Sequence, residues 1–213
     1  MTRDEFNTLG NMVACNTWRH PDIDKHPEEN VDHSNQTFFW WMQQHQEEFW
    51  SMLNILSNRE AKTVLEVGSS HGGCITFYDR LVGQDGLVIG VELNPKYAFS
   101  VQKTGKNIAT AKQELIVADS TKPTTVEKVR EVLGSRPLDF LFIDGDHTYQ
   151  GAKSDWEMYS PLVRPGGIIG FHDVAIMPET KQVFDETNMR REILPVFYMG
   201  IGLVYKDNKV SIA

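Results

Sequence analysis

The sequence has 213 residues, of which 40% are hydrophobic and 23% charged, a composition typical of a globular protein with one sizeable core. Its net charge of -8 disfavours general nucleic-acid binding, because phosphate contacts need clustered lysine and arginine. No apolar run approaches the roughly 20 residues that span a bilayer, and the first ten residues lack the apolar core of a secretion signal. We therefore expect a soluble, cytoplasmic protein with no membrane partner, whose two cysteines are reduced.

Residues 1–58 are predicted to form an N-terminal arm and a helical extension. Asn16 to Gln36 is dense in His, Asp, Glu, Asn and Pro, which is typical of a polar loop, and we hypothesise that it closes over a bound substrate. Thr37 to Leu56 places aromatic and leucine side chains among Gln and Glu at helical spacing, which predicts an amphipathic helix. Its Trp40-Trp41 pair would suit a homodimer contact if one face stays exposed.

Residues 59–213 alternate short apolar segments with longer mixed segments. The expected strands cover 63–67, 87–91, 114–117, 138–143 and 167–171, and the expected helices begin near 73 and cover 124–133 and 151–159. Such alternation predicts an α/β fold with a doubly wound, mostly parallel sheet that is buried on both faces. Segments 192–198 and 201–206 lie too close together for a helical crossover, so we expect them to pair antiparallel and close the sheet.

The turn after the first strand is rich in glycine. It reads Glu66-Val-Gly68-Ser69-Ser70-His71-Gly72-Gly73, and glycine lets a backbone turn sharply and approach a ligand. The N-terminus of the helix that follows favours an anionic group. Ser70 stands where a dinucleotide fingerprint would place its second glycine, which disfavours a dinucleotide.

Acidic residues follow the next two strands. Glu92 lies at roughly the 20-residue spacing at which nucleotide-binding folds place a carboxylate that accepts hydrogen bonds from ribose. Asp119 and Ser120 follow the third strand, where a carboxylate could accept a hydrogen bond from an adenine amine or could cap the following helix. Together with the glycine turn, these residues indicate a nucleotide-type cofactor site.

With these residues in place, the stretch from Thr63 to Lys206 resembles the class I S-adenosylmethionine-dependent methyltransferases, whose pattern includes the closing antiparallel strand. The resemblance implies S-adenosylmethionine as cofactor, with its methionine part at the glycine turn, its ribose on Glu92 and its adenine facing Asp119. The cofactor-binding residues that it implies are Glu66, Gly68, Ser69, Gly72, Glu92, Asp119, Ser120 and Asp144.

Five titratable residues follow the fourth and fifth strands: Asp144, Asp146, His147, His172 and Asp173. Adjacent parallel strands should bring them to one rim, where they would repel one another or shift in pKa unless something offsets them. A divalent cation would do so. Carboxylate oxygens suit Mg²⁺, whereas a histidine ligand would favour Mn²⁺ or another transition metal.

The run IDGDHTYQGAKSDWEMYSPLVRPGGIIGFHD, which ends at Asp173, is similar to a branch of metal-dependent O-methyltransferases. That branch includes macrocin-type and other sugar O-methyltransferases and proteins labelled cephalosporin hydroxylase-like. The resemblance implies Asp144 and Asp173 as metal ligands, and His172 stands where relatives often have a third, carboxylate ligand. Asp146 and His147 match positions proposed for the general base, and both stay candidates.

The predicted function is methyl transfer from S-adenosylmethionine to a hydroxyl of a small molecule, a sugar or polyol-like acceptor. The predicted metal, Mg²⁺ or Mn²⁺, would stabilise and orient the reacting oxygen, while the base would accept its proton.

Three alternatives stay open. A non-haem iron oxygenase could use His147, His172 and Asp173 as its ligands, although it would not need a nucleotide-type site. A dinucleotide-dependent oxidoreductase is disfavoured by Ser70 and by the closing antiparallel strand. A binding protein that has lost catalysis is disfavoured by the intact cluster of acidic residues.

Overall fold

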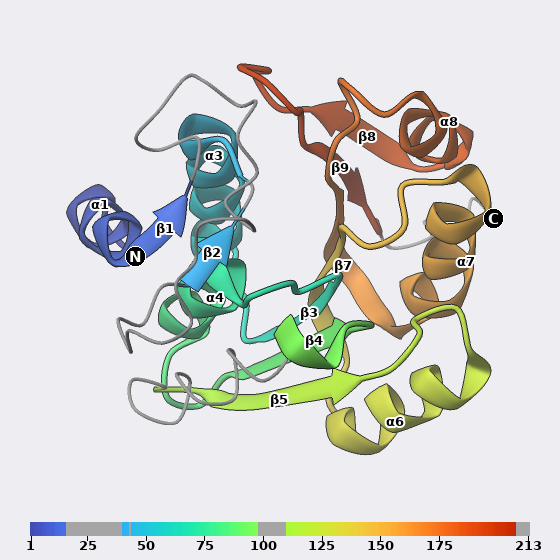
Figure 1. Cartoon of the computed structure of the whole chain (residues 1–213), viewed down its shortest axis with the longest axis horizontal. Coiled ribbons are helices and arrows are strands. Elements are labelled where there is room, and N and C mark those ends of the chain that lie inside the picture. The colour runs from blue at the N-terminus through green and yellow to red at the C-terminus, as the bar shows by residue number, and fades with distance from the viewer. Residues whose placement is uncertain (16–39, 43, 98–109, 208–213) are drawn as a thin grey trace, which may run out of the picture.

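The computed structural model describes residues 1–15, 40–42, 44–97 and 110–207. The arm predicted for Asn16 to Gln36 lies outside the described residues, so its closing role stays a prediction. The described chain forms a seven-stranded sheet with helices on both faces, which confirms the predicted doubly wound α/β class (Figure 1). A separate pair of short strands lies in the N-terminal part.

The large sheet has the strand order β5-β4-β3-β6-β7-β9-β8. Its strands are β3 (Thr63–Val67), β4 (Leu87–Glu92), β5 (Lys112–Val117), β6 (Leu138–Ile143), β7 (Val163–Phe171), β8 (Arg190–Ile193) and β9 (Gly202–Tyr205). Strands β3 to β7 pair in parallel, whereas β9 runs antiparallel to both β7 and β8, as predicted. From the central strand β3 the chain winds outward through β4 to β5, and it then returns to β6 on the other side of β3. The ends of β3, β4 and β6 therefore meet at the switch point where such sheets bind ligands.

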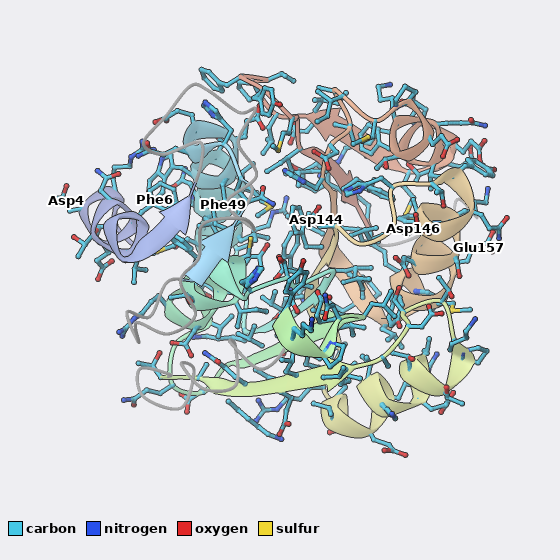
Figure 2. The ribbon with its side chains drawn as sticks, in the orientation of Figure 1. Asp4, Phe6, Phe49, Asp144, Asp146 and Glu157 are labelled. Carbon is cyan, nitrogen blue, oxygen red and sulfur yellow. The ribbon has the colours of Figure 1, made fainter. Side chains whose placement is uncertain are left out.

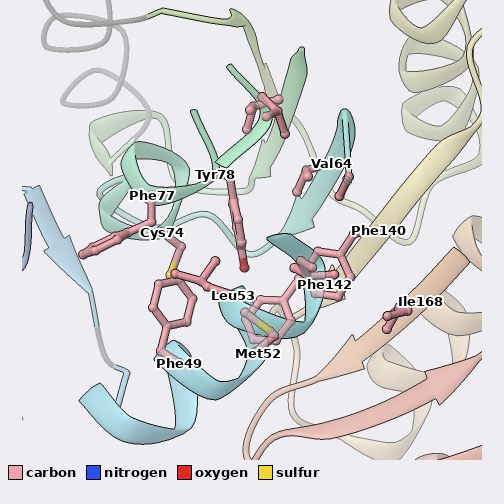
Figure 3. Close-up of a cluster of buried hydrophobic side chains, with 14 of the residues drawn as sticks. Phe49, Met52, Leu53, Val64, Cys74, Phe77, Tyr78, Phe140, Phe142 and Ile168 are labelled. Atoms are coloured by element: carbon pink, nitrogen blue, oxygen red, sulfur yellow. The ribbon is translucent and has the colours of Figure 1, made fainter. Parts of the chain in front are cut away.

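Alternate residues of each central strand feed two separate cores, because successive side chains of a strand point to opposite faces. Val64 and Phe140 face helices α3 (Gln46–Asn58) and α4 (Gly73–Val82), in the cluster that Figure 3 shows. Their neighbours Leu65 and Leu141 pack in the core on the other face. The helices on that face are α6 (Pro123–Leu133), α7 (Tyr149–Tyr159) and α8 (Pro178–Glu186).

The N-terminal part contains helix α1 (Arg3–Met12) and strand β1 (Val13–Cys15), which pairs in parallel with β2 (Trp40–Met42). Here the prediction of one helix over Thr37 to Leu56 is wrong. Trp40–Met42 is extended, in keeping with the strand preference of bulky aromatic residues. Helix α3 begins only after His45, whose side chain accepts the Glu47 backbone N–H. The Trp40-Trp41 dimer contact stays a prediction.

Aromatic packing joins the N-terminal helices to the sheet. Phe6 of α1 lies 5.2 Å from Phe77 of α4 and 6.5 Å from Phe49 of α3, measured between ring centroids. Phe49 in turn meets Phe77 edge-on at 5.4 Å. Residues on both sides of the predicted boundary at 58 therefore share one hydrophobic core.

Helix α8 was not predicted from the sequence, and strand β7 begins earlier than predicted. Helix α8 follows Met177 and begins with Pro178, which fits a first helical turn because its missing N–H needs no partner there. Strand β7 begins at Val163, after the short 3-10 turn Ser160–Leu162, and includes the Pro165-Gly166-Gly167 segment. No helix among the described residues is long and apolar enough to cross a membrane.

Candidate functional site

A cavity of about 470 Å³ opens at the carboxyl ends of β3, β4, β5 and β6, within the size range of small-molecule sites. Five of the eight predicted cofactor-binding residues line it: Gly68, Glu92, Asp119, Ser120 and Asp144. Ser70 and Asp146 also line it. The structure thus brings together residues from four strand ends, as parallel strand topology requires.

Gly68 occupies a position that only glycine can fill. Its φ of 88° is in the left-handed region, and a Cβ there would lie 2.0 Å from the carbonyl oxygen of Asp144. Ser70 also has a positive φ, 45°, which is uncommon for a residue with a side chain. The Ser70 N–H donates to Glu92 Oε2 at 2.7 Å, so the turn after β3 is bound directly to the carboxylate that ends β4.

Glu92 is 7% exposed and is held from two sides, because its Oε1 accepts the Asn94 N–H at 2.8 Å. Asp119 accepts both the hydroxyl and the N–H of Thr121, and these bonds hold the pKa of its carboxyl below the usual value. Asp119 therefore shapes the turn before α6 while it also lines the cavity. Both carboxylates are oriented before any ligand arrives.

Three predicted cofactor-binding residues lie behind the cavity wall and not on its surface. Glu66 is 1% exposed, and burial together with the nearby charge of Asp144 raises the pKa of its carboxyl well above the usual value. Ser69 packs beside Gly90 of β4, and Gly72 is the N-cap of α4 with its N–H bound to the Ser69 carbonyl. In this structure these residues support the turn.

A second group of side chains adjoins the cavity, at the ends of β6 and β7. His147 Nε2 lies 2.8 Å from Asp173 Oδ2 and 3.6 Å from Asp144 Oδ1. His172 Nδ1 lies 2.9 Å from Asp144 Oδ1 and 3.3 Å from Asp173 Oδ2. The two imidazoles and two carboxylates thus form one compact cluster, which we call the Asp–His cluster (Asp144, His147, His172 and Asp173); Figure 2 labels Asp144 near the centre of the molecule.

The charges in this cluster support one another. The neighbouring carboxylates of Asp144 and Asp173 raise the pKa of His147 to about 10. Burial by itself lowers the pKa of His172, but the charge of Asp144 and its hydrogen bond outweigh that effect and bring the value to about 10. Burial raises the pKa of Asp173, yet its bonds to the two histidines hold the value well below the usual range. In the absence of a bound cation, the two carboxylates therefore favour the protonated form of both imidazoles.

Asp146 has a different setting, because it is exposed and lies outside the cluster. Its Oδ1 accepts the Thr148 N–H at 2.9 Å at the start of α7. Its carboxyl also packs against Gly151, where an added Cβ would lie 2.4 Å from Asp146 Cγ. Because Gly151 has no side chain, the Asp146 carboxylate can occupy its position on the cavity wall.

The Asp–His cluster has a suitable donor set for a divalent cation. Asp144, His147 and Asp173 each offer a ligand atom, and these atoms lie within 4.8 Å of one another. Two carboxylate oxygens and one imidazole nitrogen suit Mg²⁺ less than Mn²⁺. His172, the predicted third ligand, is 2% exposed, and its Nε2 has no hydrogen-bond partner among the described residues. Asp173 also has a φ of 62°, a strained backbone of the kind found at functional sites.

Two buried polar residues at this site were not predicted from the sequence. Gln44 is 1% exposed, and its Nε2 donates to Asp144 Oδ2 at 3.0 Å. Asp155 of α7 is 0% exposed, and burial, with the charges of Asp146 and Asp119 adding to it, raises the pKa of its carboxyl to about 7. No spacing signals Gln44, whereas an acidic residue on the buried face of α7 was visible in the sequence.

Comparisons with known proteins agree with this arrangement. The family model described as "Methyltransferase domain" matches residues 65–174, which run from β3 past the end of β7. A catechol O-methyltransferase of Niastella koreensis is 29% identical over 110 residues, which cover 52% of this chain and 48% of that protein. A rhamnosyl O-methyltransferase of Mycobacterium leprae is 24% identical over 131 residues, 59% of this chain and 54% of that protein.

The chain therefore spans about half the length of these two relatives. A solved O-methyltransferase from Bacillus cereus, in complex with SAH, superposes with a TM-score of 0.61 at 17% identity and covers 97% of this chain and 92% of its own. That likeness establishes the shared fold. Since the family model matches more than half of the chain, the protein belongs to the methyltransferase-domain family.

Proposed function

We propose that the protein is an S-adenosylmethionine-dependent O-methyltransferase that uses a divalent cation and methylates a hydroxyl of a small sugar or polyol-like molecule. The observation that carries this proposal is that two sites lie next to each other. A nucleotide-type cavity bearing Gly68 and Glu92 directly adjoins the Asp–His cluster, and Asp144 belongs to both. The family match favours methyl transfer over the oxygenase and oxidoreductase alternatives.

The cavity residues account for cofactor binding. Glu92, held by Ser70 and Asn94, would accept hydrogen bonds from the ribose hydroxyls. The missing side chain at Gly68 lets the turn pack closely against Asp144, and we assign the methionine part to the cavity beside this turn. The methyl group would then point toward the Asp–His cluster, where the acceptor hydroxyl must lie for in-line attack on the methyl carbon.

A divalent cation would be held by Asp144 and Asp173 with one histidine nitrogen, and when bound it would favour ionisation of an acceptor hydroxyl. We assign the general base to Asp146, because His147 belongs to the donor set while Asp146 is exposed on the cavity wall. Its carboxylate would take the hydroxyl proton as the oxygen attacks the methyl carbon and S-adenosylhomocysteine leaves.

The cluster and the relatives support the proposed acceptor class. Two oxygens on neighbouring carbons can both meet one cation, which is the arrangement in sugars, polyols and catechols. The names of the two relatives, catechol and rhamnosyl O-methyltransferase, concern acceptors of this kind. We favour a sugar or polyol.

The test is a panel assay for S-adenosylhomocysteine formation with Mg²⁺, Mn²⁺ or EDTA. The panel pairs vicinal diols with matched molecules that lack one hydroxyl. We expect turnover of a diol that EDTA abolishes and that Asp146→Asn slows by about 10²–10⁴-fold, the usual contribution of a general base. Asp185→Asn, on the exposed side of α8, should leave the rate unchanged. Turnover that persists in EDTA would contradict the use of a divalent cation. Turnover that Asp146→Asn leaves unchanged would contradict the assignment of the general base.

A further inference from the structure

The segment that leads into α3 reaches the candidate cation centre from far away in the sequence. We propose that Gln44 is a positioning residue for this centre, which orients the Asp144 carboxylate for cation binding. The inference rests on the cation site of the proposed function, and it adds to that site a residue from outside the segment that the family model matches.

The hydrogen bonds divide the two oxygens of Asp144 between two partners. Gln44 Nε2 donates to Oδ2 at 3.0 Å, and His172 Nδ1 lies 2.9 Å from Oδ1. Rotation of the carboxylate about its Cβ–Cγ bond would break both contacts. Groups that orient metal ligands in this way fix the ligand geometry before the metal arrives.

Gln44 is itself held in place by the helix that follows it. One turn along the chain, the buried carboxylate of Glu48 accepts the N–H groups of Phe197 and Tyr198 at 2.6 Å each and that of Gly200 at 3.0 Å. Between these residues, the His45 ring stacks on the Phe197 ring, with 5.1 Å between the centroids and 4° between the planes. The start of α3 is thus fixed to the loop between β8 and β9.

The same loop supports the other carboxylate of the centre. The carbonyls of Gly200 and Met199 accept the N–H groups of Val174 at 3.2 Å and Ala175 at 2.9 Å, directly after Asp173. One continuous set of contacts therefore runs from Asp144 through Gln44 and Glu48 to the backbone that carries Asp173. A small shift of α3 would move both carboxylates relative to each other.

The chemistry of the side chain also fits this role. A glutamine amide donates a hydrogen bond without bringing a further positive charge next to Asp144, so the carboxylate stays available to a cation. A lysine or arginine at this place would neutralise Asp144 and repel a cation. The amide is 1% exposed, so water would not readily take over its bond to Asp144.

The test compares Gln44→Met with Gln46→Met. Methionine keeps the length of the side chain but removes the donor, and Gln46 is a neighbouring amide that donates to Asn7, away from the centre. Mn²⁺ binding to the otherwise unloaded full-length protein is measured by titration calorimetry, alongside thermal unfolding. We expect Gln44→Met to weaken Mn²⁺ binding by about 10–100-fold, the effect usual for groups that orient ligands, and Gln46→Met to leave it unchanged.

Gln44→Asn covers the case in which the methionine variant fails to fold. It keeps an amide but is one methylene too short for the bond to Asp144, so the same loss of Mn²⁺ affinity is expected. Wild-type protein that binds Mn²⁺ no better than the Gln44 variants would overturn this inference while leaving the cation site intact. Wild-type protein that binds no Mn²⁺ would instead refute the cation site itself, and this inference with it.

Discussion

Replacing Glu48 by glutamine tests how strongly helix α3 is fixed to the loop between β8 and β9. Glu48 is 0% exposed and accepts three backbone N–H groups from the loop between β8 and β9. Hydrogen bonds to a charged group contribute about 1.5–3 kcal/mol each. Glutamine would keep one acceptor oxygen, but its NH₂ would face the N–H of Gly200 or those of Phe197 and Tyr198. We estimate a loss of about 3–5 kcal/mol in the free energy of unfolding.

The assay is urea or thermal unfolding of Glu48→Gln beside Glu157→Gln, which removes an exposed carboxylate of α7. For a domain of this size, 1 kcal/mol corresponds to about 2–4 °C, so Tm should fall by about 10 °C in the first variant. The second variant should stay within about 0.5 kcal/mol of wild type. An equal, small change in both variants would refute the claim that Glu48 anchors this loop.

Two further changes probe the glycine turn at the cavity and a buried carboxyl of α7. Gly68→Ala would force a Cβ into the backbone of Asp144, so we expect loss of S-adenosylhomocysteine binding in calorimetry; unchanged affinity would contradict the role given to this turn. The pKa of Asp155 is raised to about 7 by burial, so the stability associated with its neutral form falls as the pH rises toward 7. Asp155→Asn lacks this titration. From pH 5 to pH 8, its free energy of unfolding relative to that of wild type should therefore rise by about 2–3 kcal/mol, measured by urea unfolding. A difference between the two proteins that is independent of pH would refute the raised pKa of this buried carboxyl.

Much of the seven-stranded sheet could be predicted because its signals are local. Strands such as β3 and β6 are mostly apolar segments, and the residues that follow them must meet at one edge of a parallel sheet. This topology predicts that Glu92 and Asp144 lie at the same edge of the sheet, and both line the cavity there.

The missed features depend on contacts between distant segments. Trp40–Met42 has the aromatic content of either a strand or a helix, and only its pairing with β1 decides between them. Gln44 lies 100 residues from Asp144, and no periodicity links a glutamine to a carboxylate at that distance. The backbone conformation of Ser70 could not be predicted either, because nothing in the residue type of a serine indicates a positive φ.

The most direct test of the central claim is a calorimetric titration with S-adenosylhomocysteine, with NAD titrated in parallel. We predict saturable binding of S-adenosylhomocysteine that Glu92→Ala weakens at least about tenfold, or about 1.4 kcal/mol, while Glu157→Ala leaves it unchanged. Thermal unfolding of both variants would establish that they are folded. Two results would contradict the assignment of this cavity to a methyl-donor cofactor. One is binding of NAD in place of S-adenosylhomocysteine, and the other is an affinity for S-adenosylhomocysteine that Glu92→Ala does not change.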